Sequence, residues 1–121
     1  MKILVIDDSK VMRAIVKRTL RQAGFGGHDI IEATNGAEGL DKIKGESPDL
    51  VLCDWNMPEM NGIELLTTLK AESNKVPFGF VTSEGTPEMR ATADEAGAMF
   101  LVTKPFTAED FEKALAPVLA A

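Results

Sequence analysis

The sequence is poor in the residues on which several common classes of protein depend. It has one cysteine, Cys53, so no disulfide can form within the chain, and with only one histidine it has no zinc motif. No run approaches the ~18 consecutive apolar residues that a membrane-spanning helix needs, and the N-terminus has no signal-peptide pattern. We therefore expect a cytoplasmic protein that does not enter a membrane. Cys53 lies in an apolar run, so we expect it to pack in the core and not to act as a reactive thiol.

Basic residues are also too few for a general nucleic-acid-binding protein. Thirteen Lys and Arg are outnumbered by nineteen Asp and Glu, which gives a formal net charge of −6. Binding to a polyanion needs clustered basic side chains near the phosphates, so direct binding to nucleic acid is not expected. The 121 residues, of which 45% are hydrophobic, suit one domain with one core over residues 1–121, without an output domain.

What the sequence does contain is a regular alternation of short apolar runs and helical patterns. The expected strands are 3–6, 29–33, 50–53, 76–81 and 100–103, and each is followed by apolar residues at three- and four-residue spacing. The run 29–33 is partly polar, which predicts an edge strand. Five βα units predict an α/β fold in which helices cover both faces of a parallel sheet through right-handed crossovers.

The expected helix boundaries have local signals. Ser9 is a candidate N-cap of the first helix, Gly24 is a candidate left-handed residue at its end, and Thr86 is a candidate N-cap of the fourth. In the second helix we expect one inward stripe of apolar residues, formed by Ala37, Leu40 and Ile43.

Four of the apolar runs end in residues with usable chemistry. Asp7 and Asp8 follow the first run, Asp54 the third, Thr82 the fourth and Lys104 the fifth. Each alone has an ordinary explanation as a helix cap, a turn residue or a solvated side chain. Because parallel strands end at one edge of a sheet, however, the predicted fold brings all of them to the edge where ligands bind in open α/β sheets.

Three carboxylates at one edge repel one another unless some are protonated or a hard cation lies among them. Oxygen ligands without His or Cys favour Mg²⁺, with Mn²⁺ as an alternative. A cation of this kind beside a carboxylate, a hydroxyl and an ammonium makes a site for a transferring phosphoryl group. Asp54 is the candidate reactive group.

At these residues the sequence resembles the receiver domain of two-component response regulators, in particular the stand-alone CheY-like chemotaxis regulators. The resemblance extends over essentially the whole chain and is most specific at residues 54–58, Asp-Trp-Asn-Met-Pro, followed by Gly62. It implies a flavodoxin-like (βα)5 doubly wound sheet of five parallel strands in the order 2-1-3-4-5, an order that comes from the resemblance and not from the periodicity. It also implies a cis peptide bond between Lys104 and Pro105.

The resemblance also implies a role for each residue at the acidic end. Asp54 would accept the phosphoryl group and form an aspartyl phosphate. Mg²⁺ would be bound by the carboxylates of Asp8 and Asp54 and by the backbone carbonyl of Asn56, while Asp7 would act through a metal-bound water. The expected protein is a signalling phosphoacceptor and not an enzyme, since it would catalyse only its own phosphorylation and dephosphorylation.

On the side of the phosphoryl group, Lys104 would pair with one oxygen. The hydroxyl of Thr82 would move to bond another oxygen and would draw the following loop with it. The family usually has Tyr or Phe as a rotameric switch three residues before the lysine, but here that position is Leu101. Side chains alternate along a strand, so we expect Phe100 on the opposite face of the sheet, where it cannot replace the switch.

These roles imply partners for a protein expected to be a monomer. The phosphodonor would be a histidine kinase or a phosphotransfer protein, because the only histidine, His28, lies in a Gly-rich loop and is expected to be solvated. A downstream target, such as a flagellar motor switch, would bind the face formed by the fourth helix, fifth strand and fifth helix. Basic residues also recur along the first helix, at Lys10, Arg13, Lys17 and Arg21. They form either a solvated face or a docking site for an acidic surface of the donor.

Three alternatives remain open. A phosphohydrolase of the haloacid-dehalogenase type would also use Asp, Mg²⁺, Thr and Lys at strand ends, but it normally needs a second Asp where this chain has Asn56. The chain could be a degenerate receiver that serves as a phosphorylation-independent binding scaffold, although the intact acidic residues argue against this. It could also be a fragment of a larger regulator with an output domain.

Overall fold

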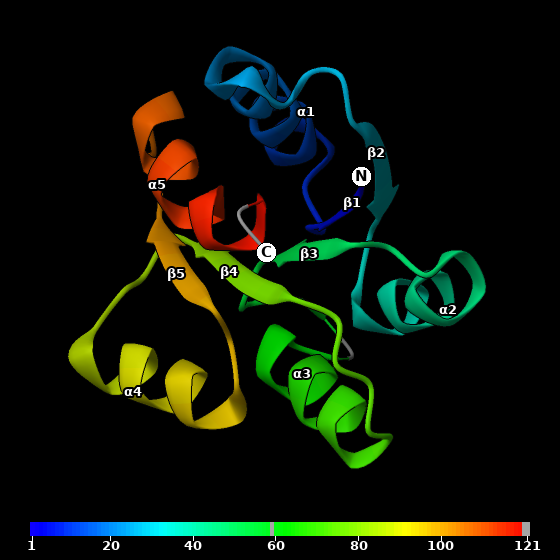
Figure 1. Cartoon of the computed structure of the whole chain (residues 1–121). Helices are drawn as coiled ribbons and strands as arrows, with labels where there is room; N and C mark the ends of the chain where they lie inside the picture. Colours follow the sequence, from blue (N-terminus) through cyan, green and yellow to red (C-terminus); the bar gives the residue numbers. More distant parts are fainter. Residues whose placement is uncertain (59, 120–121) are drawn as a thin grey trace.

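Five parallel strands form one sheet, and helices cover both of its faces (Figure 1). The computed structural model describes residues 1–58 and 60–119. The strands lie in the order β2-β1-β3-β4-β5. Their bounds are β1 (Lys2–Ile6), β2 (Asp29–Ala33), β3 (Leu50–Cys53), β4 (Phe78–Thr82) and β5 (Phe100–Thr103). The predicted flavodoxin-like sheet is therefore confirmed, together with its strand order and the edge position of β2.

The helices follow the strands in alternation, and the first continues into a short π-helical turn, η1. Their bounds are α1 (Lys10–Leu20), η1 (Arg21–Phe25), α2 (Gly36–Glu46), α3 (Gly62–Ala71), α4 (Pro87–Ala96) and α5 (Ala108–Leu119). Helices α1 and α5 cover one face of the sheet, and α2, α3 and α4 cover the other (Figure 1). Among the described residues, none of the helices has the length and apolar character needed to span a membrane.

The predicted helix boundaries are confirmed where capping residues were identified. The Ser9 hydroxyl accepts a hydrogen bond from the Met12 amide at 3.2 Å, and the Thr86 hydroxyl accepts one from the Met89 amide at 3.1 Å. Gly24 has a φ of 98°, a conformation that a residue with a side chain adopts only with strain. The chain can therefore leave the first helix at Gly24 and turn toward β2.

Strand β4 begins two residues later than its apolar run predicted, at Phe78. Pro77 has no amide hydrogen to donate to a ladder, and the Val76 amide is bonded instead to the Asn74 side chain at 3.0 Å. The strand also extends one residue further than predicted and includes Thr82. This places the Thr82 side chain in the regular sheet and not in the following loop.

The inward stripe predicted for α2 is wrong in one position, because Ala37 is exposed. Gly36 and Gly39 are buried in its place, and Ile43 is buried as predicted. A Cβ at Gly39 would lie 2.5 Å from Cδ1 of Ile6, so α2 approaches β1 through a position without a side chain. A search for apolar side chains cannot detect a helix face that packs through glycine.

Side chains from each strand alternate between two hydrophobic cores, one on each face of the sheet. On β5, Leu101 packs against the core beneath α2, α3 and α4, whereas Phe100 packs against the core beneath α1 and α5. The prediction that these two residues occupy opposite faces is confirmed. The predicted register of β5 is therefore correct, and Phe100 does not replace the missing aromatic residue at position 101.

Candidate functional site

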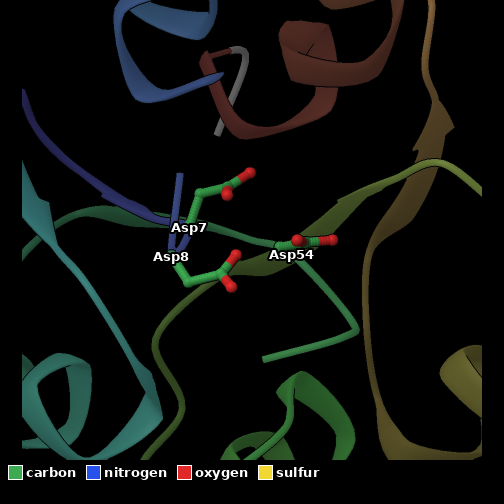
Figure 2. A group of neighbouring side chains, drawn as sticks. All are labelled: Asp7, Asp8 and Asp54. Carbon is green, nitrogen blue, oxygen red and sulfur yellow. The ribbon is translucent and has the colours of Figure 1, made fainter. Parts of the chain in front are cut away.

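The carboxyl ends of β1 and β3 bring three carboxylates together (Figure 2). Asp7 and Asp8 follow β1, Asp54 follows β3, and one oxygen atom of each lies within 4.8 Å of the others. The register of the two strands explains this meeting, because Ile6 pairs with Cys53 and the Asp54 amide donates to the Ile6 carbonyl at 2.9 Å. The acidic cluster predicted from the strand ends is present.

Backbone amides hold one oxygen of each buried carboxylate. Asp7 is 4% exposed, and its Oδ1 accepts a hydrogen bond from the Ser9 amide at 2.9 Å. Asp54 is 9% exposed, and its Oδ1 accepts one from the Trp55 amide at 2.8 Å. Asp8 is exposed, so the cluster is open to solvent on its side. Asp7 and Asp54 are thus oriented by their own turns, with Oδ2 of each left for another partner.

That partner is Lys104, which follows β5. Its Nζ lies 3.1 Å from Oδ2 of Asp7 and 3.8 Å from Oδ2 of Asp54, and its side chain is 16% exposed. The Lys104 amide donates to the Thr82 carbonyl at 2.8 Å, which continues the pairing of β4 with β5 past the end of the sheet. The Lys104–Pro105 peptide bond is cis, as predicted. The structure therefore brings the predicted lysine into contact with two of the three predicted carboxylates.

Thr82 ends β4 at the same edge of the sheet, and it is fully buried. Within residues 1–58 and 60–119, its hydroxyl oxygen accepts one hydrogen bond, a long one from the Glu84 amide at 3.5 Å. The hydroxyl is therefore weakly held and keeps its hydrogen for another acceptor. Asn56 is exposed in the loop after Asp54, and the use of its backbone carbonyl as a metal ligand stays a prediction.

The surroundings of Asp54 disfavour its charged form. Burial raises the pKa of the Asp54 carboxyl, the Lys104 ammonium opposes this rise, and the nearby Asp7 carboxylate adds to it. Burial also raises the pKa of the Cys53 thiol, whose sulfur donates to the Asp54 carbonyl at 3.1 Å. Cys53 is thus buried and protonated, in keeping with the predicted packing role.

We expect the Asp54→Asn variant to be more stable than the parent protein at pH 7 in Mg²⁺-free buffer. The folded protein holds the Asp54 proton more tightly than the unfolded chain does, so ionisation costs stability as the pH rises through the folded pKa. The advantage of Asn should therefore shrink as the pH falls toward the ordinary aspartate pKa of 3.8. Urea unfolding of both proteins across this range measures the difference. Equal stability at pH 7 would contradict the raised pKa.

A second basic residue lies behind the acidic cluster. Nη1 of Arg13 donates to the Asp7 carbonyl at 2.7 Å, and its Nε pairs with Glu32 at 3.1 Å, so the side chain joins the β1–α1 turn to strand β2. Glu32 pairs with Lys17 as well, also at 3.1 Å. The predicted outward basic stripe is therefore wrong for Arg13 and Lys17, because both side chains are partly buried and share the Glu32 carboxylate. A signal for this pairing was present in the sequence, because Glu32 is a charged residue inside a predicted strand and needs a partner.

The single histidine is not part of this site. His28 lies in the loop before β2, at the amino end of the sheet, whereas the acidic cluster lies at the carboxyl end. It was expected to be solvated, but it is half-buried, with Nδ1 at 2.8 Å from the Met1 backbone nitrogen and its ring 6.1 Å from that of Phe25. Met1, which precedes β1, and Phe25 of η1 cover His28 in a loop whose glycines suggested an open surface.

Known proteins resemble this chain in sequence and in structure. The family model described as response regulator receiver domain matches residues 3–116. A chemotaxis protein CheY homolog of Campylobacter jejuni is 42% identical over 122 aligned positions, which cover 98% of this chain and 92% of that protein. Chemotaxis protein CheY1 of Helicobacter pylori is 39% identical, with coverages of 98% and 97%. The solved structure of chemotaxis response regulator CheY4 of Vibrio cholerae is 33% identical, with a TM-score of 0.83 and 97% of both chains covered.

Proposed function

Because this chain belongs to the response regulator receiver domain family, we propose that it is a phosphoacceptor in two-component signal transduction, with a role in chemotaxis. The observation that carries the proposal is the grouping of Asp54 with two further carboxylates and Lys104 at one edge of the sheet. The names of the Campylobacter and Helicobacter relatives support the assignment to chemotaxis.

In the proposed reaction, Oδ2 of Asp54 attacks the phosphorus atom of the donor. The bond between the phosphorus and the donor's leaving group breaks, and a mixed anhydride forms on the carboxyl group. The Trp55 amide supports this step because it fixes Oδ1 and so orients the other oxygen. Lys104 supports it because its ammonium, 3.8 Å from Oδ2, can neutralise negative charge on the incoming phosphoryl group.

The donor set fits Mg²⁺ or Mn²⁺, since it consists of carboxylate oxygens that approach within 4.8 Å of one another. Asp8, Asp54 and the backbone carbonyl of Asn56 would hold the ion directly, and Asp7 would hold it through water. When bound, the cation offsets the repulsion among the carboxylates and the charge of the phosphoryl oxygens.

The signal would then pass from the phosphoryl group to the surface. The Thr82 hydroxyl, whose hydrogen bond from the Glu84 amide is long, would move to bond a phosphoryl oxygen and draw the β4–α4 loop with it. We propose that a histidine kinase or a phosphotransfer protein is the donor. The downstream target, such as a flagellar motor switch, would bind the face formed by α4, β5 and α5. The monomeric state and the single receiver domain over residues 1–121 stay predictions.

Acetyl phosphate tests the reaction without the cognate donor. We expect the chain to take up one phosphoryl group, seen in its intact mass, when Mg²⁺ is present, because the buried carboxylates otherwise repel an anionic donor. Excess chelator should abolish the uptake, and Mn²⁺ should support it when it replaces Mg²⁺ in buffer without chelator. Full uptake in excess chelator would contradict the metal site. No uptake under any of these conditions would favour a phosphorylation-independent binding scaffold.

A further inference from the structure

The side chain of Arg90 ties the loop after β4 to strand β5. Arg90 lies in α4, and its Nε donates to the Gly85 carbonyl while its Nη1 donates to the Leu101 carbonyl, each at 3.3 Å. Strand β5 is at the edge of the sheet, so its outward backbone groups have no neighbouring strand to bond. One guanidinium group therefore bridges the β4–α4 loop and the outer strand.

Gly85 lies so close to β5 that the loop has no room for a side chain there. A Cβ at this position would be 2.3 Å from Cγ2 of Thr103, 3.1 Å from Nη2 of Arg90 and 3.4 Å from Cδ2 of Leu101. Gly85 thus packs most closely against Thr103 of β5 and lies near Leu101, the half-buried residue that occupies the position of the family's usual aromatic switch. At that position Arg90 bonds the Leu101 carbonyl, and the loop at Gly85 lies close by.

Free space surrounds these contacts. Arg90 and Leu101 both line a hollow of about 350 Å³ on the side of α5, and both line a second hollow of about 170 Å³ on the side of Met99. Arg90 is exposed, so its guanidinium can leave the two carbonyls without opening the core. The bridge can therefore form and break while the rest of the fold is unchanged.

Only a short stretch of chain separates Gly85, which Arg90 bonds, from Thr82 at the phosphoacceptor site. Thr82 is three residues before Gly85, and its hydroxyl accepts a long hydrogen bond, 3.5 Å, from the intervening Glu84 amide. If Thr82 moves toward Asp54, as the proposed function requires, the loop must move with it. That movement would separate Gly85 from β5 and lengthen the hydrogen bond from Arg90 to the Gly85 carbonyl.

We propose that Arg90 is a positioning residue that holds the β4–α4 loop on β5 in the unphosphorylated protein. The proposal rests on the proposed function, because the state that Arg90 opposes is the one in which Thr82 bonds the phosphoryl group. A contact made in only one of two states shifts the equilibrium toward that state. Arg90 therefore makes the phosphorylated conformation harder to reach, and it acts through the loop without contact with the reacting atoms.

Beryllofluoride, a stable mimic of the phosphoryl group, tests the proposal in the presence of Mg²⁺. Trp55 is the only tryptophan and adjoins Asp54, so its fluorescence reports binding. We expect Arg90→Ala to bind beryllofluoride about three- to tenfold more tightly than the parent, as loss of hydrogen bonds from a charged group in one state allows. Arg90→Lys should lie between them, because one ammonium does not reproduce the two-pronged contact of a guanidinium.

Lys113→Ala is the matched control. Lys113 lines the larger hollow as Arg90 does, but its ion pair is with Glu109 in its own helix, at 3.2 Å. Its removal should leave the affinity for beryllofluoride unchanged. Amide hydrogen exchange in residues 83–86 of the metal-free protein gives a second readout, and it should be faster in Arg90→Ala than in the parent or in Lys113→Ala.

The outcomes separate this proposal from the proposed function. If the parent binds beryllofluoride and Arg90→Ala binds it equally or more weakly, the positioning role of Arg90 is wrong. An equal gain in Lys113→Ala, or unchanged exchange in residues 83–86 of Arg90→Ala, overturns it too. If the parent does not bind beryllofluoride with Mg²⁺ at all, the proposed function fails first and the role of Arg90 fails with it.

Discussion

The Asp54→Asn variant is expected to take up at least about a hundredfold less phosphoryl group from acetyl phosphate than the parent, because a neutral amide is not a nucleophile of the required kind. The change is otherwise small. An Asn side chain has the same shape and keeps an oxygen that can accept the hydrogen bond now donated by the Trp55 amide at 2.8 Å. The loss would therefore report the chemistry of position 54 and not a disturbed fold.

Intact-mass measurement in Mg²⁺ gives the yield of both proteins under the same conditions. Asp41→Asn is the control, because Asp41 is an exposed carboxylate on α2 and is not part of the acidic cluster. This control should take up the phosphoryl group as the parent does. If Asp54→Asn retains the parental yield, another group accepts the phosphoryl group and the assignment of Asp54 is wrong.

The Gly62→Ala variant should lose stability and lose phosphoryl uptake together. A Cβ at Gly62 would lie 2.4 Å from the Asp54 carbonyl oxygen and 2.7 Å from the Phe80 ring, and Phe80 is fully buried. Neither group is the flexible end of a side chain, so the start of α3 or the backbone of Asp54 must shift. We expect a loss of about 1–3 kcal/mol in the free energy of unfolding, as for other overpacked sites, measured in urea.

Gly45→Ala is the matched substitution within a helix. Gly45 lies in α2, and a Cβ there would meet no atom within 4 Å. Alanine should therefore stabilise the protein by about 0.5–1 kcal/mol, through the better helix propensity of alanine. If Gly62→Ala is as stable as Gly45→Ala and takes up phosphoryl group at the parental rate, close packing at Gly62 does not position Asp54.

The main parts of the site could be predicted because each follows directly from a strand end. The runs that end at Asp7, Asp54 and Lys104 are short and apolar, and in a parallel sheet such runs finish at one edge. Local signals were sufficient for the ends of these three strands, and pairing between neighbours then brought the side chains together. The strand order could not be predicted from this pattern. It came from the family resemblance.

The supporting contacts could not be predicted, because each joins segments that are distant in the sequence. Arg13 reads as an outward base on an amphipathic helix until β2 supplies Glu32 as its partner. Arg90 reads as a surface residue of α4 until its bonds to Gly85 and Leu101 are seen. Helical periodicity predicts which face of a helix is polar, but it does not predict which polar side chains find a partner in the tertiary structure.

Chemical trapping of the modified residue tests the central claim most directly. Borohydride reduces an acyl phosphate on aspartate to homoserine, which marks the acceptor permanently before proteolysis and peptide sequencing by mass. After treatment with acetyl phosphate and Mg²⁺, we predict homoserine at position 54, and none there when chelator replaces Mg²⁺, because the proposed function makes Asp54 the acceptor, with its Oδ2 3.8 Å from Nζ of Lys104 and its carboxylate in the acidic cluster that would hold the cation. Homoserine at Asp7 or Asp8 and not at Asp54, or equal trapping at Asp54 in chelator, would contradict the account.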